Sequence, residues 1–141
     1  MTQLINISEA VSIAYHGIAV IADNAPQRMN ISTISDILKV SQPHLAKVFQ
    51  ILTKHGVLDS SRGPKGGFIL RLDPKDITFL MIYEIIEAKI TISECPLGRN
   101  NCPFRNCIFD KKLTHLSRKI YKTFGEITLS EFLKDVDYRE D

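Results

Sequence analysis

The stretch that decides the fold is SQPHLAKVFQILTKH, residues 41–55. Ser41 is a favoured helix N-cap, and Pro43 falls in the first turn, where its missing N–H costs little. Gly56 follows as a typical residue for the end of a helix. The apolar residues recur at helical spacing and predict one buried face: Leu45, Val48, Phe49 and Leu52.

Two further helices are predicted before this stretch. Residues 32–38 (STISDIL) predict a short helix with Ile34, Ile37 and Leu38 on one face, and Lys39-Val40 leaves only a tight connection. Residues 8–22 (SEAVSIAYHGIAVIA) predict a buried first helix that ends at the proline-containing stretch 24–26. A short helix, a tight turn and a longer helix are typical of a helix-turn-helix.

Two short β-type runs follow, Val57-Leu58 and residues 68–70, joined by the loop RGPKGG at residues 62–67. Two strands with a basic, Gly- and Pro-rich loop between them indicate a wing. Beyond the wing, residues 77–88 predict an apolar helix, and residues from about 109 to 124 predict a long one. Thr128 and Glu131 form a capping box for a last short helix. The predicted fold class is mainly α with a small β wing.

The composition sets outer limits on the kind of protein. The chain has 141 residues, of which 44% are hydrophobic and 24% charged, which suits a compact core and argues against disorder. The net charge of only +2 excludes a histone-like basic protein. No apolar run approaches the roughly 18 residues of a membrane span, and the N-terminal residues lack a secretory-signal pattern. We therefore expect a cytoplasmic protein without a membrane partner.

The positive charge is concentrated in residues 37–72, which hold six bases and a single acid, Asp59. A charge-rich segment is often just a solvated face, but this one coincides with the helix-turn-helix and the wing, so we predict double-stranded DNA as a partner. Gln42 suits adenine, and Lys47 suits a phosphate. For Gln42 and His44, the alternative is ordinary helix-surface polarity. The predicted DNA-binding residues are Ser41, Gln42, His44 and Lys47 on the helix and Arg62 and Lys65 on the wing.

The three cysteines, Cys95, Cys102 and Cys107, lie within 13 residues and are spaced C-x6-C-x4-C. An odd number in one short segment argues against a disulfide framework. The surrounding Pro, Gly and Asn residues predict an irregular loop that could hold an iron–sulfur cluster, with the fourth ligand from elsewhere. No C-x2-C knuckle is present, and zinc binding or a thiol–disulfide switch remain alternatives.

Several segments together resemble a family of bacterial winged-helix iron–sulfur regulators that includes IscR and the nitric-oxide-sensing repressor NsrR. The matching segments are SRGPKGGF at 61–68, DIT at 76–78, the three-cysteine loop with the long helix after it, and ITLSEFL at 127–133. The resemblance implies a homodimer built on the long helix. It also implies one iron–sulfur cluster of two or four irons per subunit, and a pseudo-palindromic operator.

Within that family, residues 101–105 and 44–47 are more similar to the NsrR type. Ala46 and Asp110 stand where IscR-like proteins have a glutamate and a histidine. In NsrR-type proteins the fourth ligand is an aspartate near the start of the first helix of the partner subunit. Ser8 of this chain stands at the position of that aspartate, and Glu9 is the next residue. We therefore expect Glu9 as the fourth ligand and Asp110 as the alternative. A carboxylate at Glu9 would also simply stabilise a helix N-terminus.

Together with this resemblance, the sequence predicts a homodimeric transcriptional repressor rather than an enzyme. The repressor would sense nitric oxide, oxygen or iron–sulfur status through a labile cluster. Residues 1–75 would form the DNA-binding region. Residues 76–141 would form a helical dimerisation and cluster-binding region within one compact unit. The alternatives are a winged-helix regulator with a metal-free thiol switch or a zinc site, or a small iron–sulfur electron carrier.

Overall fold

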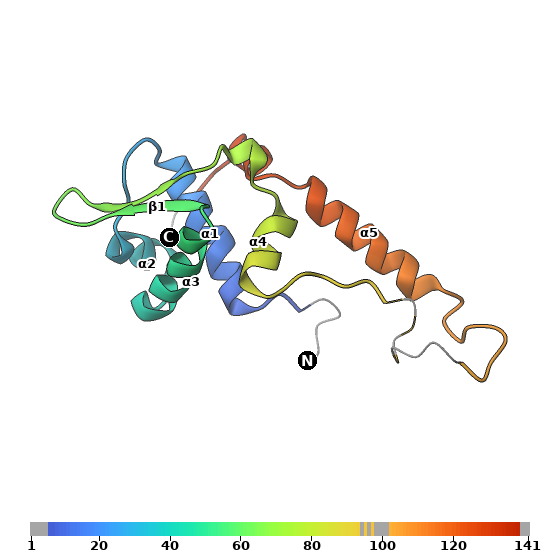
Figure 1. Ribbon diagram of the computed structural model, residues 1–141. Coiled ribbons are helices and arrows are strands. Elements are labelled where there is room, and N and C mark those ends of the chain that lie inside the picture. Colours follow the sequence, from blue (N-terminus) through green and yellow to red (C-terminus); the bar gives the residue numbers. More distant parts are fainter. Residues whose placement is uncertain (1–5, 94, 96, 98–101, 139–141) are drawn as a thin grey trace.

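The computed structural model describes residues 6–93, 95, 97 and 102–138, and it is mainly helical with one two-stranded sheet (Figure 1). This architecture confirms the predicted fold class. The elements in chain order are α1 (Glu9–Asp23), α2 (Ile31–Leu38), α3 (Gln42–Lys54), β1 (Leu58–Ser61), β2 (Gly67–Leu70), the 3-10 turn η1 (Pro74–Asp76), α4 (Phe79–Ile86), α5 (Lys112–Glu126) and α6 (Leu129–Leu133). Within the described ranges, no helix combines the length and hydropathy that crossing a bilayer requires.

Local capping explains where the helices of the helix-turn-helix begin. The Ser41 Oγ accepts a hydrogen bond from the His44 N–H at 3.3 Å, which confirms the predicted start of α3. Asn30 caps α2 in the same way, and Lys39 ends it in the left-handed conformation with φ 54°. This single left-handed residue turns the chain from α2 into α3 within three residues.

The buried face of α2 differs from the prediction. Ile34 and Ser35 are buried, whereas Ile37 is 43% exposed. Ile34 packs into the core cluster, with the partly buried Ile31 and Leu38 beside it, so the buried stripe runs along one side of the helix and leaves Ile37 on its flank.

The core lies between α1 and α3. The largest fully buried side chains include Ile18 and Ile21 of α1 and Leu45, Phe49 and Leu52 of α3. Gly17 is at the closest approach, because a Cβ added there would lie 2.5 Å from Cε1 of Phe49. The absence of a side chain at Gly17 therefore lets the two helices pack this closely.

The wing is an antiparallel hairpin in which Leu58 pairs with Leu70 and Ser61 with Gly67. Its strands are longer than predicted, because Asp59 to Ser61 continue the first one. Met29 adds a bridge to Phe68, with N–H to carbonyl distances of 3.0 and 2.8 Å. Gly67, at φ 138°, is required there, because a Cβ would lie 2.6 Å from the Met29 carbonyl oxygen.

The helices of the second half are shorter or shifted relative to the prediction. α4 begins at Phe79, because Thr78 is its N-cap and accepts from the Met81 N–H at 3.1 Å. α5 begins at Lys112 rather than near 109, because Asp110 and Lys111 have φ values of 49° and 56°, which are incompatible with a right-handed helix. The capping box of Thr128 and Glu131 is confirmed at the start of α6.

The start of α4 and the end of α5 are joined by backbone hydrogen bonds. The Phe79 N–H donates to the Ile127 carbonyl at 2.9 Å, and the Leu129 N–H donates to the Ile77 carbonyl at 2.9 Å. From this joint, α5 extends away from the rest of the chain (Figure 1). The N-terminal end of α5 and the cysteine-bearing segment therefore lie at the far end of the molecule from the wing.

A matched pair of glycine substitutions tests the packing of α1 on α3. We expect Gly17→Ala to lower the free energy of unfolding by about 1–2 kcal/mol, because overpacking against Phe49 outweighs the gain in helix propensity. Gly125→Ala should instead raise it by up to about 1 kcal/mol, because the nearest side-chain atom to the new Cβ would be at 3.7 Å. Urea unfolding measures the change in the free energy of unfolding for each variant. Stabilisation by both substitutions would contradict the close contact between Gly17 and Phe49.

Candidate DNA-binding surface and cysteine segment

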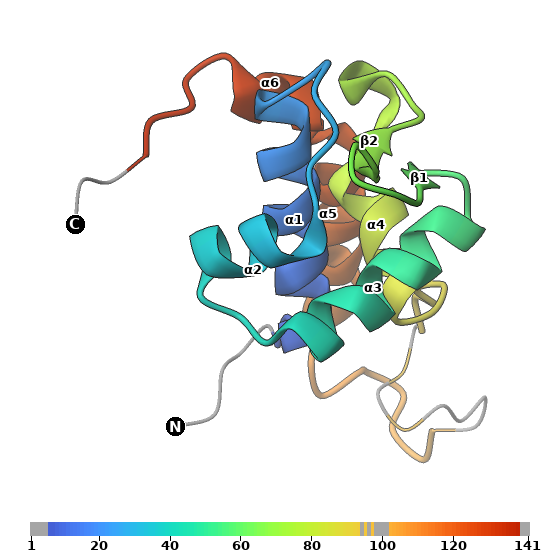
Figure 2. The same cartoon turned by 90° about the vertical axis from the view of Figure 1, so that its left-hand side faces the viewer.

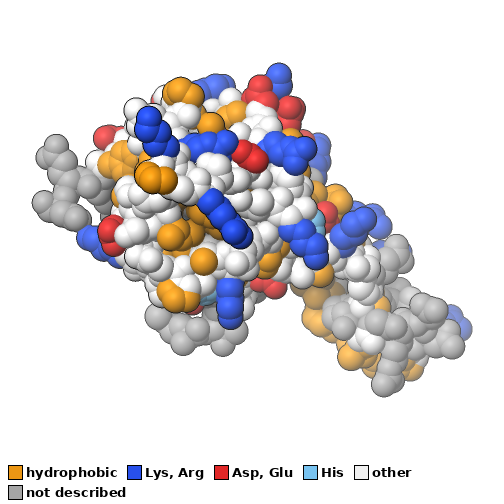
Figure 3. All heavy atoms as spheres, turned by 60° about the vertical axis from the view of Figure 1, so that its left-hand side comes forward, with side chains coloured by type: hydrophobic (Ala, Val, Ile, Leu, Met, Phe, Trp, Pro, Cys, Tyr) orange, Lys and Arg blue, Asp and Glu red, His pale blue; other side chains and the backbone are white. Residues whose placement is uncertain are grey.

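The N-terminal end of α3 is presented to solvent because its apolar residues are turned into the core. Ser41, Gln42 and Lys47 are exposed and His44 is half-buried, on the same end of the helix. In Figure 2, α2 and α3 lie side by side on the face that also carries the hairpin. Figure 3 shows more Lys and Arg than acidic side chains over this side of the molecule. We call α3, its N-cap Ser41 and the hairpin the basic face.

Three of the predicted base-reading side chains have partners within the chain. The Ser41 hydroxyl caps α3, and the Gln42 Nε2 donates to the Ser32 Oγ at 3.2 Å. The His44 Nδ1 lies 3.9 Å from the Glu9 Oε1. These contacts orient the side chains, and each of them is weak enough to exchange for a contact with a base.

The tip of the wing carries Arg62 and Lys65, both exposed, on a tight turn. Gly63 has φ 102°, and the Gly66 N–H donates to its carbonyl at 2.9 Å. A Cβ on Gly66 would lie 2.4 Å from the Ser61 carbonyl oxygen, so the turn requires glycine. The RGPKGG loop is therefore shaped to project two positive side chains.

Arg28 also belongs to this surface, although no sequence pattern indicates it. Its guanidinium Nη2 lies 2.7 Å from the Asp59 Oδ2, and Nη1 donates to the Gly67 carbonyl at 3.3 Å. Asp59 is the single acid of residues 37–72, so this pair neutralises the one negative charge on the wing. The pairing joins residues 31 positions apart, and no local pattern could have indicated it.

The described part of the cysteine segment contains no helix or strand. Cys95 is half-buried, Cys102 and Cys107 are exposed, and all three are free thiols. Backbone N–H groups of Lys111 and Phe109 lower the pKa of the Cys107 thiol. A lowered pKa favours the thiolate, which is the form that binds metals and reacts with oxidants.

The chemistry of this donor set fits a thiolate-bound metal, but the described geometry does not assemble one. Among the residues that the structure describes, no three His, Cys, Asp or Glu side chains converge on a point where a metal could bind. Asp110 lies beside Lys112, with an Oδ2 to Nζ distance of 3.7 Å. Asn101, part of the NsrR-like motif, lies outside the described residues.

Glu9 is the first residue of α1 and its side chain is 77% exposed. It lies against α3 through His44, whereas the described residues just before α5 lie at the projecting end of that helix (Figure 1). Within one chain, Glu9 and the cysteines are therefore not brought together. A ligand role for Glu9 requires the cysteines of a second subunit.

The long helix α5 leaves an apolar stripe uncovered. Leu113 is 42% exposed, Leu116 53% and Tyr121 37%. Towards its other end the helix is anchored, because the Phe124 ring meets the Phe79 ring edge-on at a centroid distance of 4.5 Å. Exposed apolar residues at helical spacing on a projecting helix are typical of a helix–helix interface.

Comparison with known proteins identifies the family. Residues 7–135 match the Rrf2 family, described as an iron-dependent transcriptional regulator. An HTH-type transcriptional regulator of Aquifex aeolicus is 31% identical over 129 residues, covering 89% of this chain and 90% of that protein. The regulator IscR of Yersinia pestis is 28% identical over 111 residues, covering 78% of this chain and 67% of that protein.

Solved structures share the fold. CymR, the global cysteine regulator of B. subtilis, superposes with a TM-score of 0.81 at 18% identity, covering 95% of this chain and 100% of that chain. IscR of T. potens gives 0.76 at 21% identity, covering 95% and 90%. The oxidized form of CymR from Staphylococcus aureus gives 0.74 at 19% identity, covering 95% and 100%.

The match extends over both the winged helix-turn-helix and the long helix, so it includes every segment that carries the sequence resemblance. It confirms a transcriptional regulator rather than an enzyme. The closer similarity to the NsrR type stays a prediction. The chain belongs to the Rrf2 family of transcriptional regulators.

Proposed function

We propose that the chain is a homodimeric repressor that binds a pseudo-palindromic operator in double-stranded DNA. The observation that carries this proposal is the basic face, where the exposed end of α3 and the wing tip together present Lys47, Arg62 and Lys65. A recognition helix in the major groove places its N-terminal residues at base edges, and a wing reaches the adjacent backbone. Ser41, Gln42 and His44 would then read bases or phosphates.

Dimerisation would occur through α5. Its uncovered apolar residues, Leu113, Leu116 and Tyr121, give a second copy a surface to bury. We place the boundary between the DNA-binding region and the helical region at residues 75 and 76. Both regions would share one core, because Ile82 of α4 and Leu129 of α6 are buried in the same cluster as Phe49 of α3.

Variants of the basic face test the DNA proposal, with an operator first obtained by selection from genomic fragments. Lys47→Gln and Arg62→Gln should weaken binding on all sequences, and each should reduce the slope of log K against log salt by about 1. Gln42→Ala should cost about 1–3 kcal/mol and relax the preference at a single base pair. Lys119→Gln on α5, away from the basic face, is the control. An equal effect of Lys119→Gln would contradict the proposal.

We further propose that Cys95, Cys102 and Cys107 hold one iron–sulfur cluster per subunit, with two or four irons. Three thiols on an irregular segment, one of them with a lowered pKa, supply the soft ligands that such a group requires. Iron bound in this way reacts with oxygen and nitric oxide, which would make the segment a sensor. Glu9 of the partner subunit would be the fourth ligand, and Asp110 is the alternative.

A metal-free thiol switch is the second candidate function for the cysteines. Cys102 and Cys107 are exposed, and the lowered pKa of Cys107 favours attack on an oxidant. The structural similarity to a CymR crystallised in an oxidized form supports this candidate. A zinc site formed by the same thiols is a third candidate.

Metal analysis of anaerobically purified protein separates these functions. The cluster proposal predicts iron and acid-labile sulfide in near-equal amounts, with a broad visible absorption that nitric oxide bleaches. Cys→Ala at each of the three positions should abolish both the iron and sulfide content and the visible absorption. Glu9→Ala should lower cluster retention, whereas Glu87→Ala, at the exposed C-cap of α4, should not. Zinc without sulfide would establish the zinc site instead, and a colourless, metal-free protein after reconstitution would leave the thiol switch.

A further inference from the structure

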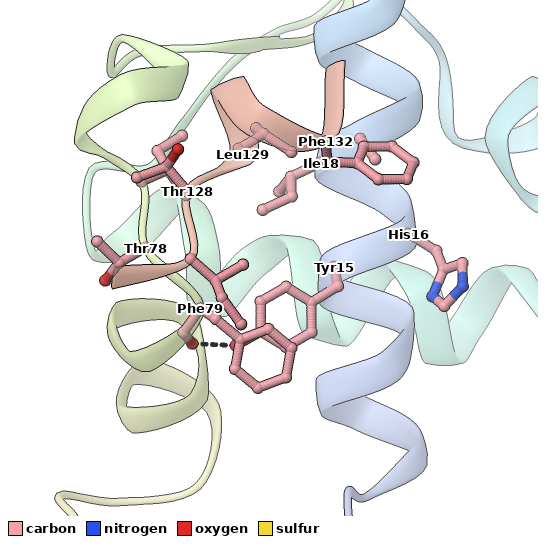
Figure 4. A pocket seen from close by; sticks show the side chains of 11 residues that line it. Tyr15, His16, Ile18, Thr78, Phe79, Thr128, Leu129 and Phe132 are labelled. Carbon is pink, nitrogen blue, oxygen red and sulfur yellow. Dashed lines mark hydrogen bonds between the residues drawn. The ribbon is translucent and has the colours of Figure 1, made fainter. Parts of the chain in front are cut away.

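A cavity of about 240 Å³ lies between α1, the segment that enters α4 and the segment that links α5 to α6 (Figure 4). Its buried walls include Ile18, Ile77 and Leu129, which are 1%, 1% and 9% exposed. Tyr15, Phe79 and Phe132 add three aromatic rings. The lining also includes His16, Thr78 and Thr128 but no Lys, Arg, Asp or Glu, so most of it is apolar. The His16 ring lies at the edge, with its Nδ1 2.7 Å from the Ser12 carbonyl oxygen (Figure 4).

The aromatic wall of the cavity is held in place without a ligand. The rings of Tyr15 and Phe79 stack with a centroid distance of 3.9 Å and an interplanar angle of 11°. The Tyr15 hydroxyl donates to the Phe79 carbonyl oxygen, so its polar group is satisfied inside an apolar environment (Figure 4). The bridge between Thr78 and Thr128 joins two of the lining segments. The walls are therefore fixed by contacts that a guest molecule need not supply.

The opening of the cavity is also apolar. Ile127 is 43% exposed and Phe132 is 57% exposed, and both line the cavity. An occupant would cover these side chains and remove their surface from water, at roughly 25 cal/mol per Å². Concave apolar sites of this kind are where small molecules bind in proteins.

We propose that this cavity is a binding site for a small, uncharged aromatic molecule. An apolar cavity of about 150 Å³ holds benzene. The larger volume here fits a benzene ring with a short substituent. Edge-to-face contacts with Phe132 and the Tyr15–Phe79 pair favour an aromatic ring. A charged ligand is disfavoured, because it would lose hydration in a cavity whose walls are mainly apolar side chains.

The site stands independently of the operator and metal proposals. Its walls come from α1, on which α3 packs, and from the joint at the end of α5. An occupant would contact both parts at once and would stabilise their arrangement in the folded state. A side chain from a second copy is the competing occupant, because the opening carries the exposed side chains of Ile127 and Phe132.

Titration of the ¹⁵N-labelled full-length protein with p-cresol tests the proposal. We expect saturable shifts confined to α1 and residues 77–79 and 127–132, with a dissociation constant below about 1 mM. Benzoate, similar in size but charged, should bind at least about tenfold more weakly. Ala19→Leu should fill the cavity, and Phe132→Ala should remove one wall. Each should weaken p-cresol binding by about tenfold or more.

Phe104→Ala is the matched control, because Phe104 is 59% exposed, nearly as much as Phe132, and does not line the cavity. It should leave p-cresol binding unchanged. The absence of saturable shifts in the wild type would overturn the proposal, and so would equal binding by the folded Ala19→Leu and Phe132→Ala variants. Loss of the dimer in Ala19→Leu, without p-cresol binding by the wild type, would place a partner side chain in the cavity.

Discussion

The close contact between Gly17 of α1 and Phe49 of α3 is the constraint on which the rest of the structure depends. It buries the apolar side of α3, which is why the other side and the N-terminal end of that helix face solvent. Through other residues, α1 also contacts α2, β2, α4 and α6. One central helix therefore positions the recognition helix, the wing and the joint from which α5 projects. A shift of α1 would therefore displace each of these elements.

Local signals in the sequence were sufficient for much of the fold. The N-cap at Ser41, the glycines of the wing and the capping box at Thr128 each depend on residues a few positions apart, so they could be predicted. The late start of α5 could not, because two consecutive non-glycine residues with positive φ follow no simple sequence rule. Ile37 lies off the buried face that its spacing predicts, because a short helix has too few apolar residues to fix its buried stripe.

The candidate site can also be predicted in part, because some of its residues are close together in the sequence. The basic residues of α3 and the wing are close in sequence, and the structure exposes Lys47, Arg62 and Lys65 on the basic face. The pairing of Arg28 with Asp59 and the approach of Glu9 to His44 join distant segments, and only the fold reveals them. Glu9 thus contacts α3 through His44, and it is also the residue proposed as the fourth ligand of the cluster. Within our account, this contact is the shortest physical route from the cysteine segment of one subunit to the DNA-reading end of the other.

The most direct test of the account is the operator affinity of the anaerobically purified protein, measured before and after stoichiometric nitric oxide. Coupling free energies between two sites are typically about 1–3 kcal/mol, so the affinity should fall by about 5- to 150-fold. The Cys102→Ala variant should show no response. An unchanged affinity in the wild type, or an equal response in the variant, would contradict the claim that the cysteine segment controls DNA binding.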